Sequence, residues 1–218
     1  MKNLVVAIDG PAGAGKSTVA QIAAKELGYT YIDTGAMYRA VAWKVLQQGK
    51  EITDERIIDT VKDIVVVLRY EDGKTTVQVD DCDVTAAIRT PEVTQIVSQV
   101  AKLAPVREKM VELQRQMASQ GAVVMDGRDI ATNVLPQADV KIFLTASIEE
   151  RARRRWQELQ GKGYAVDLPS LQAEIAARDK ADSEREISPL VQAKDAALLD
   201  TTGLSIDEVV KSILNACR

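Results

Sequence analysis

Residues 10–17 constrain the fold more than any other part of the chain, because they read as a glycine-rich loop between a buried strand and a helix. Their sequence, Gly-Pro-Ala-Gly-Ala-Gly-Lys-Ser, fits the pattern G-x-x-x-x-G-K-[S/T] without a gap. The apolar run 4–8 precedes the loop, and apolar residues recur at helical spacing over 19–27. An ordinary glycine-rich turn is the alternative. Lys16, Ser17 and both flanking segments favour a phosphate-binding loop.

A loop of this kind points consecutive backbone N–H groups at one anion, and the following helix adds the positive end of its dipole. We therefore expect the loop to bind the phosphates of a nucleoside triphosphate. Lys16 would reach the β- and γ-phosphates, and the hydroxyl of Ser17 would bind Mg²⁺. The predicted ATP-binding residues of the loop are Gly10, Pro11, Ala12, Gly13, Ala14, Gly15, Lys16, Ser17 and Thr18.

Short apolar runs alternate with helical patterns through most of the chain. This order predicts an α/β fold, with a parallel sheet covered by helices on both faces. The expected strands are residues 4–8, 29–32, 122–125, 140–144 and 197–199. Expected helices include residues 37–48 and two that begin with capping boxes, at Ser147 with Glu150 and at Ser205 with Glu208.

The segment of about 60–120 interrupts this alternation. Asp72 and Gly73 separate two strand-like runs, which predicts a hairpin. Two helices follow, one beginning at Thr90-Pro91 and one at Pro105, and Gly121 is the expected stop of the second. We interpret this segment as an insertion into the α/β core.

The composition excludes several classes of function. The 218 residues contain no histidine, which rules out histidine acid–base catalysis, a Ser-His-Asp triad and histidine-ligated metals. With 28 basic and 32 acidic residues, the formal net charge of −4 argues against a nucleic-acid partner. Cys82 and Cys217 form no paired motif, and no apolar run approaches the ~20 residues that span a bilayer. We expect no signal peptide, no membrane segment and a cytoplasmic location.

Polar clusters follow two of the predicted strands. The residues 33–39 come after the second strand, and the residues 126–129 come after the third. The carboxyl ends of parallel strands meet at one edge of a sheet, so both clusters should lie near the phosphate loop. Asp33 and Asp126 could instead be helix caps. Two such clusters together favour a binding site.

Arginines dominate the carboxyl-terminal part of the chain. The run 151–155 lies on a predicted helix ending near Gly161 and Gly163, whose flexibility would let residues of about 151–168 act as a lid. A solvated helix face is the alternative for this run. Arg178, Asp182 and Arg185 are spaced i, i+4, i+7 and should share one helix face, unless they form only a surface salt-bridge ladder.

The stretches GPAGAGKST, DTGAMYR, IRTPEV, VMDGRD and ARDKADSER together resemble the bacterial cytidylate kinases, from residue 2 to about residue 218. The resemblance implies a single domain with the nucleoside monophosphate kinase fold, that is, a five-stranded parallel sheet. Its core would be about 1–60 and 121–218, with a CMP-binding insertion at about 61–120 and a short lid. The implied reaction moves the γ-phosphoryl group of ATP to CMP or dCMP.

The same resemblance assigns residue roles. Lys16, Arg128 and Arg185 are the expected catalytic residues, and Arg153 is expected at ATP. The phosphate of CMP would contact Arg39, Arg128 and Arg185. The cytosine would contact Ser98, Arg107 and Asp129, and the ribose would contact Arg178 and Asp182. The full CMP set is Thr34, Arg39, Ser98, Arg107, Arg128, Asp129, Arg178, Asp182 and Arg185. Many relatives have glycine where this chain has Ala131, so we expect a stiffer loop there.

Two other functions stay open at this stage. A P-loop kinase for another small acceptor is one, although the many arginines favour an acceptor that carries phosphate. A GTPase switch is the other. The residues 179–182, Asp-Lys-Ala-Asp, only superficially resemble the guanine-reading N-K-x-D. We expect a monomer with small-molecule substrates and no nucleic-acid or membrane partner.

Overall fold

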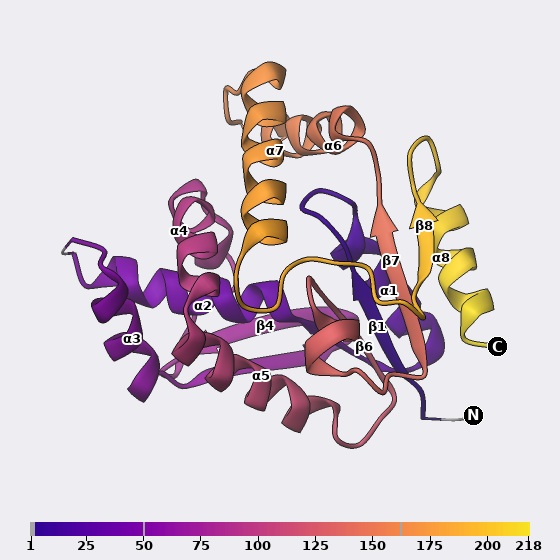
Figure 1. Ribbon diagram of the computed structural model, residues 1–218, viewed down its shortest axis with the longest axis horizontal. Coiled ribbons are helices and arrows are strands. Elements are labelled where there is room, and N and C mark those ends of the chain that lie inside the picture. The colour runs from indigo at the N-terminus through magenta and orange to yellow at the C-terminus, as the bar shows by residue number, and fades with distance from the viewer. Residues whose placement is uncertain (1–2, 50, 162) are drawn as a thin grey trace.

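The main sheet of the computed structural model has five parallel strands in the order β2-β6-β1-β7-β8 (Figure 1). The model describes residues 3–49, 51–161 and 163–218. The predicted α/β fold with a five-stranded parallel sheet is thereby confirmed. The strands are β1 (Val5–Asp9), β2 (Thr30–Asp33), β6 (Val123–Gly127), β7 (Val140–Thr145) and β8 (Ala197–Asp200).

Helices cover both faces of this sheet, because the strand side chains alternate between two cores. On the central strand β1, Val6 and Ile8 pack into one buried cluster with α1 (Lys16–Leu27) and α8 (Ile206–Ala216). Ala7 points to the other face, into a cluster with residues of α5 (Ala104–Ala118) and of η2 (Ile130–Val134), a single π-helical turn. The phosphate loop therefore leaves the middle of a sheet that is buried on both sides.

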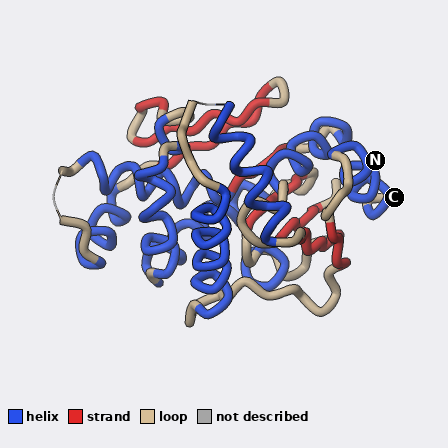
Figure 2. The backbone as a smooth tube through the Cα atoms, turned by 90° about the horizontal axis from the view of Figure 1, so that it is seen from above, coloured by secondary structure: helices blue, strands red, loops and turns tan. Residues whose placement is uncertain are grey.

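The segment between β2 and β6 has a core of its own under α2 (Thr34–Gln47). A small antiparallel sheet lies there, and Figure 2 shows two separate groups of strands. Its strands are β3 (Val66–Glu71), β4 (Lys74–Val79) and the short β5 (Cys82–Asp83). The hairpin expected at Asp72-Gly73 is confirmed.

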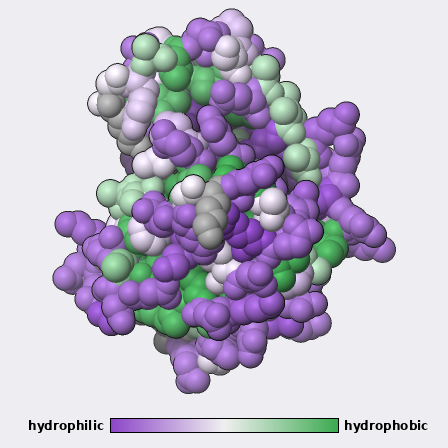
Figure 3. Space-filling model, turned by 90° about the vertical axis from the view of Figure 1, so that its left-hand side faces the viewer, coloured by the Kyte–Doolittle hydropathy of each residue, from purple (hydrophilic) through white to green (hydrophobic). Residues whose placement is uncertain are grey.

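The other elements of this segment are α3 (Asp54–Asp63), η1 (Ala87–Arg89) and α4 (Pro91–Lys102). The helix α3 was not predicted from the sequence. It begins where the hydroxyl of Thr53 accepts a hydrogen bond from the Arg56 N–H. Ile57 and Val61 supply its narrow buried face. The face of the molecule in Figure 3 is hydrophilic over most of its area, with apolar residues in small groups.

The helices α6 (Ile148–Gly161) and α7 (Leu168–Glu184) stand beyond the carboxyl ends of the strands (Figure 1). They pack against each other through Ala152, Leu159, Leu171 and Ile175, a cluster separate from the cores of the sheet. Lys162, in the expected lid, lies outside the described residues, as do residues 1, 2 and 50.

Several local expectations need correction. Only half of the predicted capping box at Ser147 is present. The Glu150 N–H donates to Ser147 Oγ at 3.2 Å, but the Ser147 N–H donates to Thr202 and the Glu150 carboxylate accepts from Arg153 and Arg154. The box at Ser205 is confirmed. Two helices also differ in extent: α2 begins at Thr34, three residues earlier than predicted, and α5 ends at Ala118, before Gly121.

Candidate active site

The loop between β1 and α1 has a conformation that requires glycine. Gly10 has φ +149°, and a Cβ there would lie 1.9 Å from the carbonyl oxygen of Leu144 on β7. No side chain caps the amino end of α1, since Gly15 is its N-cap residue. The free N–H groups of the first turn and the helix dipole thus favour an anion at this point.

Lys16 lies inside this loop. Its side chain is buried, and Nζ donates to the carbonyl oxygen of Pro11 at 2.8 Å. Burial and the nearby positive charge of Arg128 lower the pKa of Lys16, whereas Asp126 and Asp9 counteract the shift. A buried cation whose hydrogen-bond partner in the described part of the chain is a carbonyl is well placed to neutralise phosphate oxygens.

Asp126, at the end of β6, connects the loop to the neighbouring strand. Its carboxylate accepts hydrogen bonds from Ser17 Oγ at 3.1 Å and from Tyr31 Oη at 2.7 Å. Burial and the neighbouring charge of Asp33 raise the pKa of Asp126. Asp126 thus caps no helix, while Asp33 does cap α2, accepting from the Ala36 N–H at 2.9 Å. Asp33 is also ion-paired with Arg89.

Near the loop, arginines from different elements form a partly buried group. Burial and the charges of Arg178 and Arg89 lower the pKa of Arg39 to about 9. Burial and the charge of Arg128 lower the pKa of Arg178 to about 10, and its Nε is buried without a hydrogen-bond partner. Cations that repel one another in a buried place are stabilised by a polyanion. This arrangement therefore suits a phosphorylated ligand.

Two of these arginines donate hydrogen bonds to side chains of the site. Arg128 Nε donates to Asp182 at 2.9 Å, and Arg39 Nη1 donates to the Thr94 hydroxyl at 2.7 Å. Arg128 follows β6 and Asp182 lies on α7, so this ion pair joins two elements and is not part of a ladder within one helix. Arg185 is the C-cap residue of α7, and the charges of Arg178 and Arg185 both act on Asp182, which agrees with the predicted shared face.

Asp129 forms a second buried polar group beside the first. It is ion-paired with Arg107 and, at 3.3 Å, with Arg185. The guanidinium of Arg107 also lies over the ring of Tyr38, 5.7 Å from its centroid. Sequence reasoning missed one member of the group: Asn133 Nδ2 donates to Asp129 Oδ2 at 3.1 Å. Its only sequence signal is its position four residues after Asp129 on the same turn.

The turn η2, which carries Asn133, is tied to the strand before the phosphate loop. The carboxylate of Asp9 accepts from the N–H groups of Ile130 and Ala131, both at 2.8 Å. Burial raises the pKa of Asp9 to about 6, although these two hydrogen bonds oppose the shift. Ala131 has a negative φ, a conformation that alanine adopts without strain.

The arginine run on α6 divides between the inside and the outside of the molecule. Arg151 donates to the carbonyl oxygen of Ala12 and pairs with Asp179 of α7, and Arg154 donates to Ala14 and Thr201. Both arginines therefore bind backbone carbonyl oxygens of the phosphate loop. Arg153 is exposed and pairs with Glu150. The alternative of a solvated helix face therefore applies to Arg153 but not to Arg151 and Arg154.

The other predicted residues fall around the same edge. The hydroxyl of Thr34 donates to the carbonyl oxygen of Asp126 at 2.8 Å, and Ser98 lies half-buried on α4. A Cβ on Gly127 would come within 2.6 Å of Thr34 Oγ1, so the strand end requires glycine. Asp179 and Asp182 lie within α7 and pair with arginines, which removes the resemblance to a guanine-reading loop.

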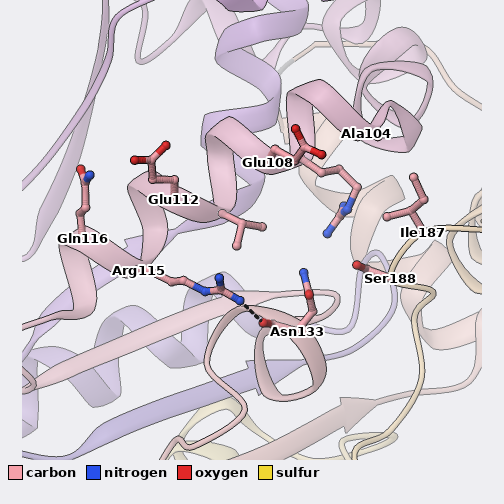
Figure 4. Close-up of a pocket in the computed structure, with 10 residues that line it drawn as sticks. Ala104, Glu108, Glu112, Arg115, Gln116, Asn133, Ile187 and Ser188 are labelled. Carbon is pink, nitrogen blue, oxygen red and sulfur yellow. Dashed lines mark hydrogen bonds between the residues drawn. The ribbon is translucent and has the colours of Figure 1, made fainter.

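A cleft of about 550 Å³ borders this region between α5, η2 and residues 187–188 (Figure 4). Arg107 and Asn133 are among its lining residues. Among the described residues, no group of three or more acidic or cysteine side chains could hold a metal ion. None of the described helices combines the length and apolar character that crossing a membrane requires.

A phosphate loop after the central strand, a buried lysine and a nearby group of arginines define a P-loop kinase. Solved structures support this class at the level of the fold. A shikimate kinase from Bacteroides thetaiotaomicron is 14% identical with a TM-score of 0.50, covering 98% of each chain. A gluconokinase from Sinorhizobium meliloti is 16% identical with a TM-score of 0.50, covering 98% of this chain and 91% of that one.

Sequence comparison narrows the class to one family. The cytidylate kinase family model matches residues 6–218. A cytidylate kinase of Desulfitobacterium hafniense is 55% identical over 215 residues, covering 98% of this chain and 92% of that protein. One from Bacillus cytotoxicus is 54% identical over 216 residues, covering 98% and 95%. The chain belongs to the cytidylate kinase family, as the motifs in its sequence predicted.

Proposed function

We propose that this protein transfers the γ-phosphoryl group of ATP to CMP or dCMP, giving ADP and CDP or dCDP. The observation that carries the proposal is the partly buried group of Arg39, Arg128 and Arg178 near the phosphate loop. Asp182 pairs with Arg128, but an acceptor without a phosphate would still leave this group with an excess of positive charge. Membership of the cytidylate kinase family supports the same acceptor.

The reaction needs charge neutralisation and alignment more than a protein base. An oxygen of the acceptor phosphate, already ionised near neutral pH, attacks the γ-phosphorus while the bond to the bridging oxygen of ADP breaks. Lys16 would neutralise the transferring group from the loop side. Arg128 and Arg185 would hold the acceptor phosphate in line with it. The absence of histidine from the chain is compatible with this chemistry.

Asp129 and Arg107 would read the base. Cytosine presents one amino donor and two acceptors on its pairing edge, so a carboxylate suits the amino group and a guanidinium suits N3 and O2. Both side chains are buried, where an unmatched polar group is costly. Ser98 would add to this contact, Thr34 would lie beside the nucleotide, and Arg178 and Asp182 would hold the ribose.

The residues present fit a magnesium ion bound together with ATP. Ser17 supplies a hydroxyl oxygen, and Asp126 supplies a carboxylate oxygen 3.1 Å away from it. Mg²⁺ takes one or two such oxygen ligands together with phosphates and water. The ion would neutralise charge on the phosphates during transfer. In such a site the phosphates of ATP would supply the other ligands. This agrees with the finding that the described residues contain no cluster of acidic or cysteine side chains that could hold a metal by itself.

The proposal also includes the roles expected for the separate segments of the chain. Residues of about 61–120 would form the CMP-binding insertion and about 151–168 the lid, within a single domain with its core at 1–60 and 121–218. Arg153 is exposed enough to turn toward ATP when the lid closes. The protein would act as a cytoplasmic monomer without nucleic-acid or membrane partners.

A coupled assay of ADP release with a panel of acceptors tests the proposal. CMP and dCMP should be turned over best, UMP less, and AMP, GMP, shikimate and gluconate least. Unpaired buried polar groups cost about 1–3 kcal/mol, so the CMP preference over UMP should be roughly ten- to hundredfold. Equal kcat/KM for CMP and UMP would overturn the reading of Asp129. If only acceptors without a phosphate group were turned over, the proposed reaction would be wrong.

A further inference from the structure

Asn133 is directed back at the carboxylate of Asp129 from the turn η2. Its Nδ2 donates to Oδ2 at 3.1 Å, and Arg107 Nη2 donates to the same oxygen. Arg185 Nη2 makes the longer contact, 3.3 Å, with Oδ1. In Figure 4 the side chain of Asn133 rises from its turn toward the part of the cleft where Ser188 lies. Oδ2 of Asp129 thus accepts two hydrogen bonds, and Oδ1 accepts one longer hydrogen bond.

The backbone under Asn133 is fixed on several sides. Its N–H donates to the carbonyl oxygen of Asp129 at 2.9 Å, and its own carbonyl accepts from Arg115 Nη2 at 2.8 Å. Asp9 holds the start of the same turn through two N–H groups. The amide therefore meets Asp129 without a further loss of conformational freedom, which is what makes a supporting hydrogen bond effective.

We propose that Asn133 is a positioning residue that sets base choice by fixing which oxygen of Asp129 is offered to the nucleotide. This inference rests on the proposed function. A carboxylate oxygen has two lone-pair sites, and Arg107 and Asn133 occupy those of Oδ2. Oδ1 is left to accept from the amino group of cytosine once Arg185 turns to the phosphate. The oxygen at position 4 of uracil would be repelled there.

The charged and titratable groups that face Asp129 are Arg107 from α5, Arg185 after α7, Asp9 from β1 and Tyr38 from α2. Among the hydrogen-bond partners of Asp129 in the described part of the chain, Asn133 is the uncharged donor. Its replacement can therefore change the hydrogen bonds of Asp129 without removing either ion pair.

The first test compares Asn133→Ala with Thr132→Ala, a change of a neighbouring half-buried residue on the same turn. A hydrogen bond to a charged group is worth about 1.5–3 kcal/mol, which corresponds to roughly a tenfold effect or more. We expect kcat/KM for CMP to fall about tenfold in Asn133→Ala, mainly through KM for CMP, with KM for ATP changing less than about twofold. The preference for CMP over UMP should shrink, and Thr132→Ala should keep the wild-type preference.

The isosteric variant Asn133→Asp gives the sharper test. It places a second carboxylate within hydrogen-bond distance of Oδ2 of Asp129, where the wild type has an amide donor. The two like charges repel each other unless one group holds a proton, so Asp129 should be displaced most at high pH, and the preference for CMP over UMP should fall as the pH rises from about 6 to about 8. A residue that only supports the fold would not produce this pH-dependent change. If Asn133→Ala unfolds, as judged by circular dichroism, this variant alone decides.

The outcomes separate this inference from the proposed function. Turnover of CMP by the wild-type enzyme tests the function, whereas the change in the CMP-to-UMP ratio among variants tests Asn133. A ratio equal to wild type in both Asn133 variants at every pH would overturn the role of Asn133. If the wild type turns over neither nucleotide, the same comparison is made on CMP and UMP binding by calorimetry, where equal ratios would again overturn it.

Discussion

Replacing Asp9 by asparagine should change how the stability of this protein depends on pH. Burial raises the pKa of Asp9 from 3.8 to about 6 in the folded state. A shift of about 2 units corresponds to about 3 kcal/mol. Because the folded state binds the proton more tightly, this stabilising contribution is complete below about pH 4 and is lost as the pH rises through about 6.

The wild type should therefore lose about 2 kcal/mol relative to Asp9→Asn between about pH 4 and pH 7.5, which covers most of the titration. The asparagine also loses one of the two acceptors for the Ile130 and Ala131 N–H groups, and this cost is an offset that does not depend on pH. Urea unfolding at several pH values, followed by circular dichroism, measures the difference. Parallel curves for the two proteins would refute the argument that a buried, ionised Asp9 is costly.

Three further predictions concern the site. Lys16→Ala should lose most of its activity at an unchanged unfolding midpoint, because its charge acts where phosphate charge develops; near-normal turnover would contradict this. Arg185→Ala should raise KM for CMP and lower kcat, with a smaller change in KM for ATP. Asp182→Ala should make the kcat/KM values for CMP and dCMP more alike. Unchanged steady-state kinetics in both variants would show that the two residues have only a structural role. Arg151→Met should lower the free energy of unfolding by about 3 kcal/mol, because it leaves Asp179 without its buried partner; a loss below about 1 kcal/mol would show that water solvates Asp179.

The local part of this structure could be predicted from the sequence because short-range rules govern it. The apolar run before Gly10 and the helical spacing after Ser17 determine a strand, a loop and a helix, and the structure has all three. The alternation of strands and helices then requires a parallel sheet, since each strand must return to the same edge. The family, too, was predictable from its motifs.

The roles of the arginines were only partly predictable. Spacing places Arg151, Arg153 and Arg154 on one helix, but it does not tell which side of that helix packs against the phosphate loop. The apolar contacts of α6 with α7 turn Arg151 and Arg154 inward and leave Arg153 exposed. Burial of a helix face depends on its neighbours, which are distant in the sequence.

The contacts around Asp129 depend on the tertiary structure, although the family resemblance had already placed Arg107 and Asp129 together at the cytosine. Arg107, Arg185 and Asp9 come from three separate segments, and only the order of the strands and the packing of α5 bring them to η2. The position of Asn133 four residues after Asp129 was too weak a signal, because its amide meets Asp129 through a π-helical turn that departs from regular helix spacing. The sequence determined which chemical groups this protein carries near its phosphate loop. The tertiary structure decided which of them meet, because hydrogen bonds between distant segments depend on the packed positions of whole elements.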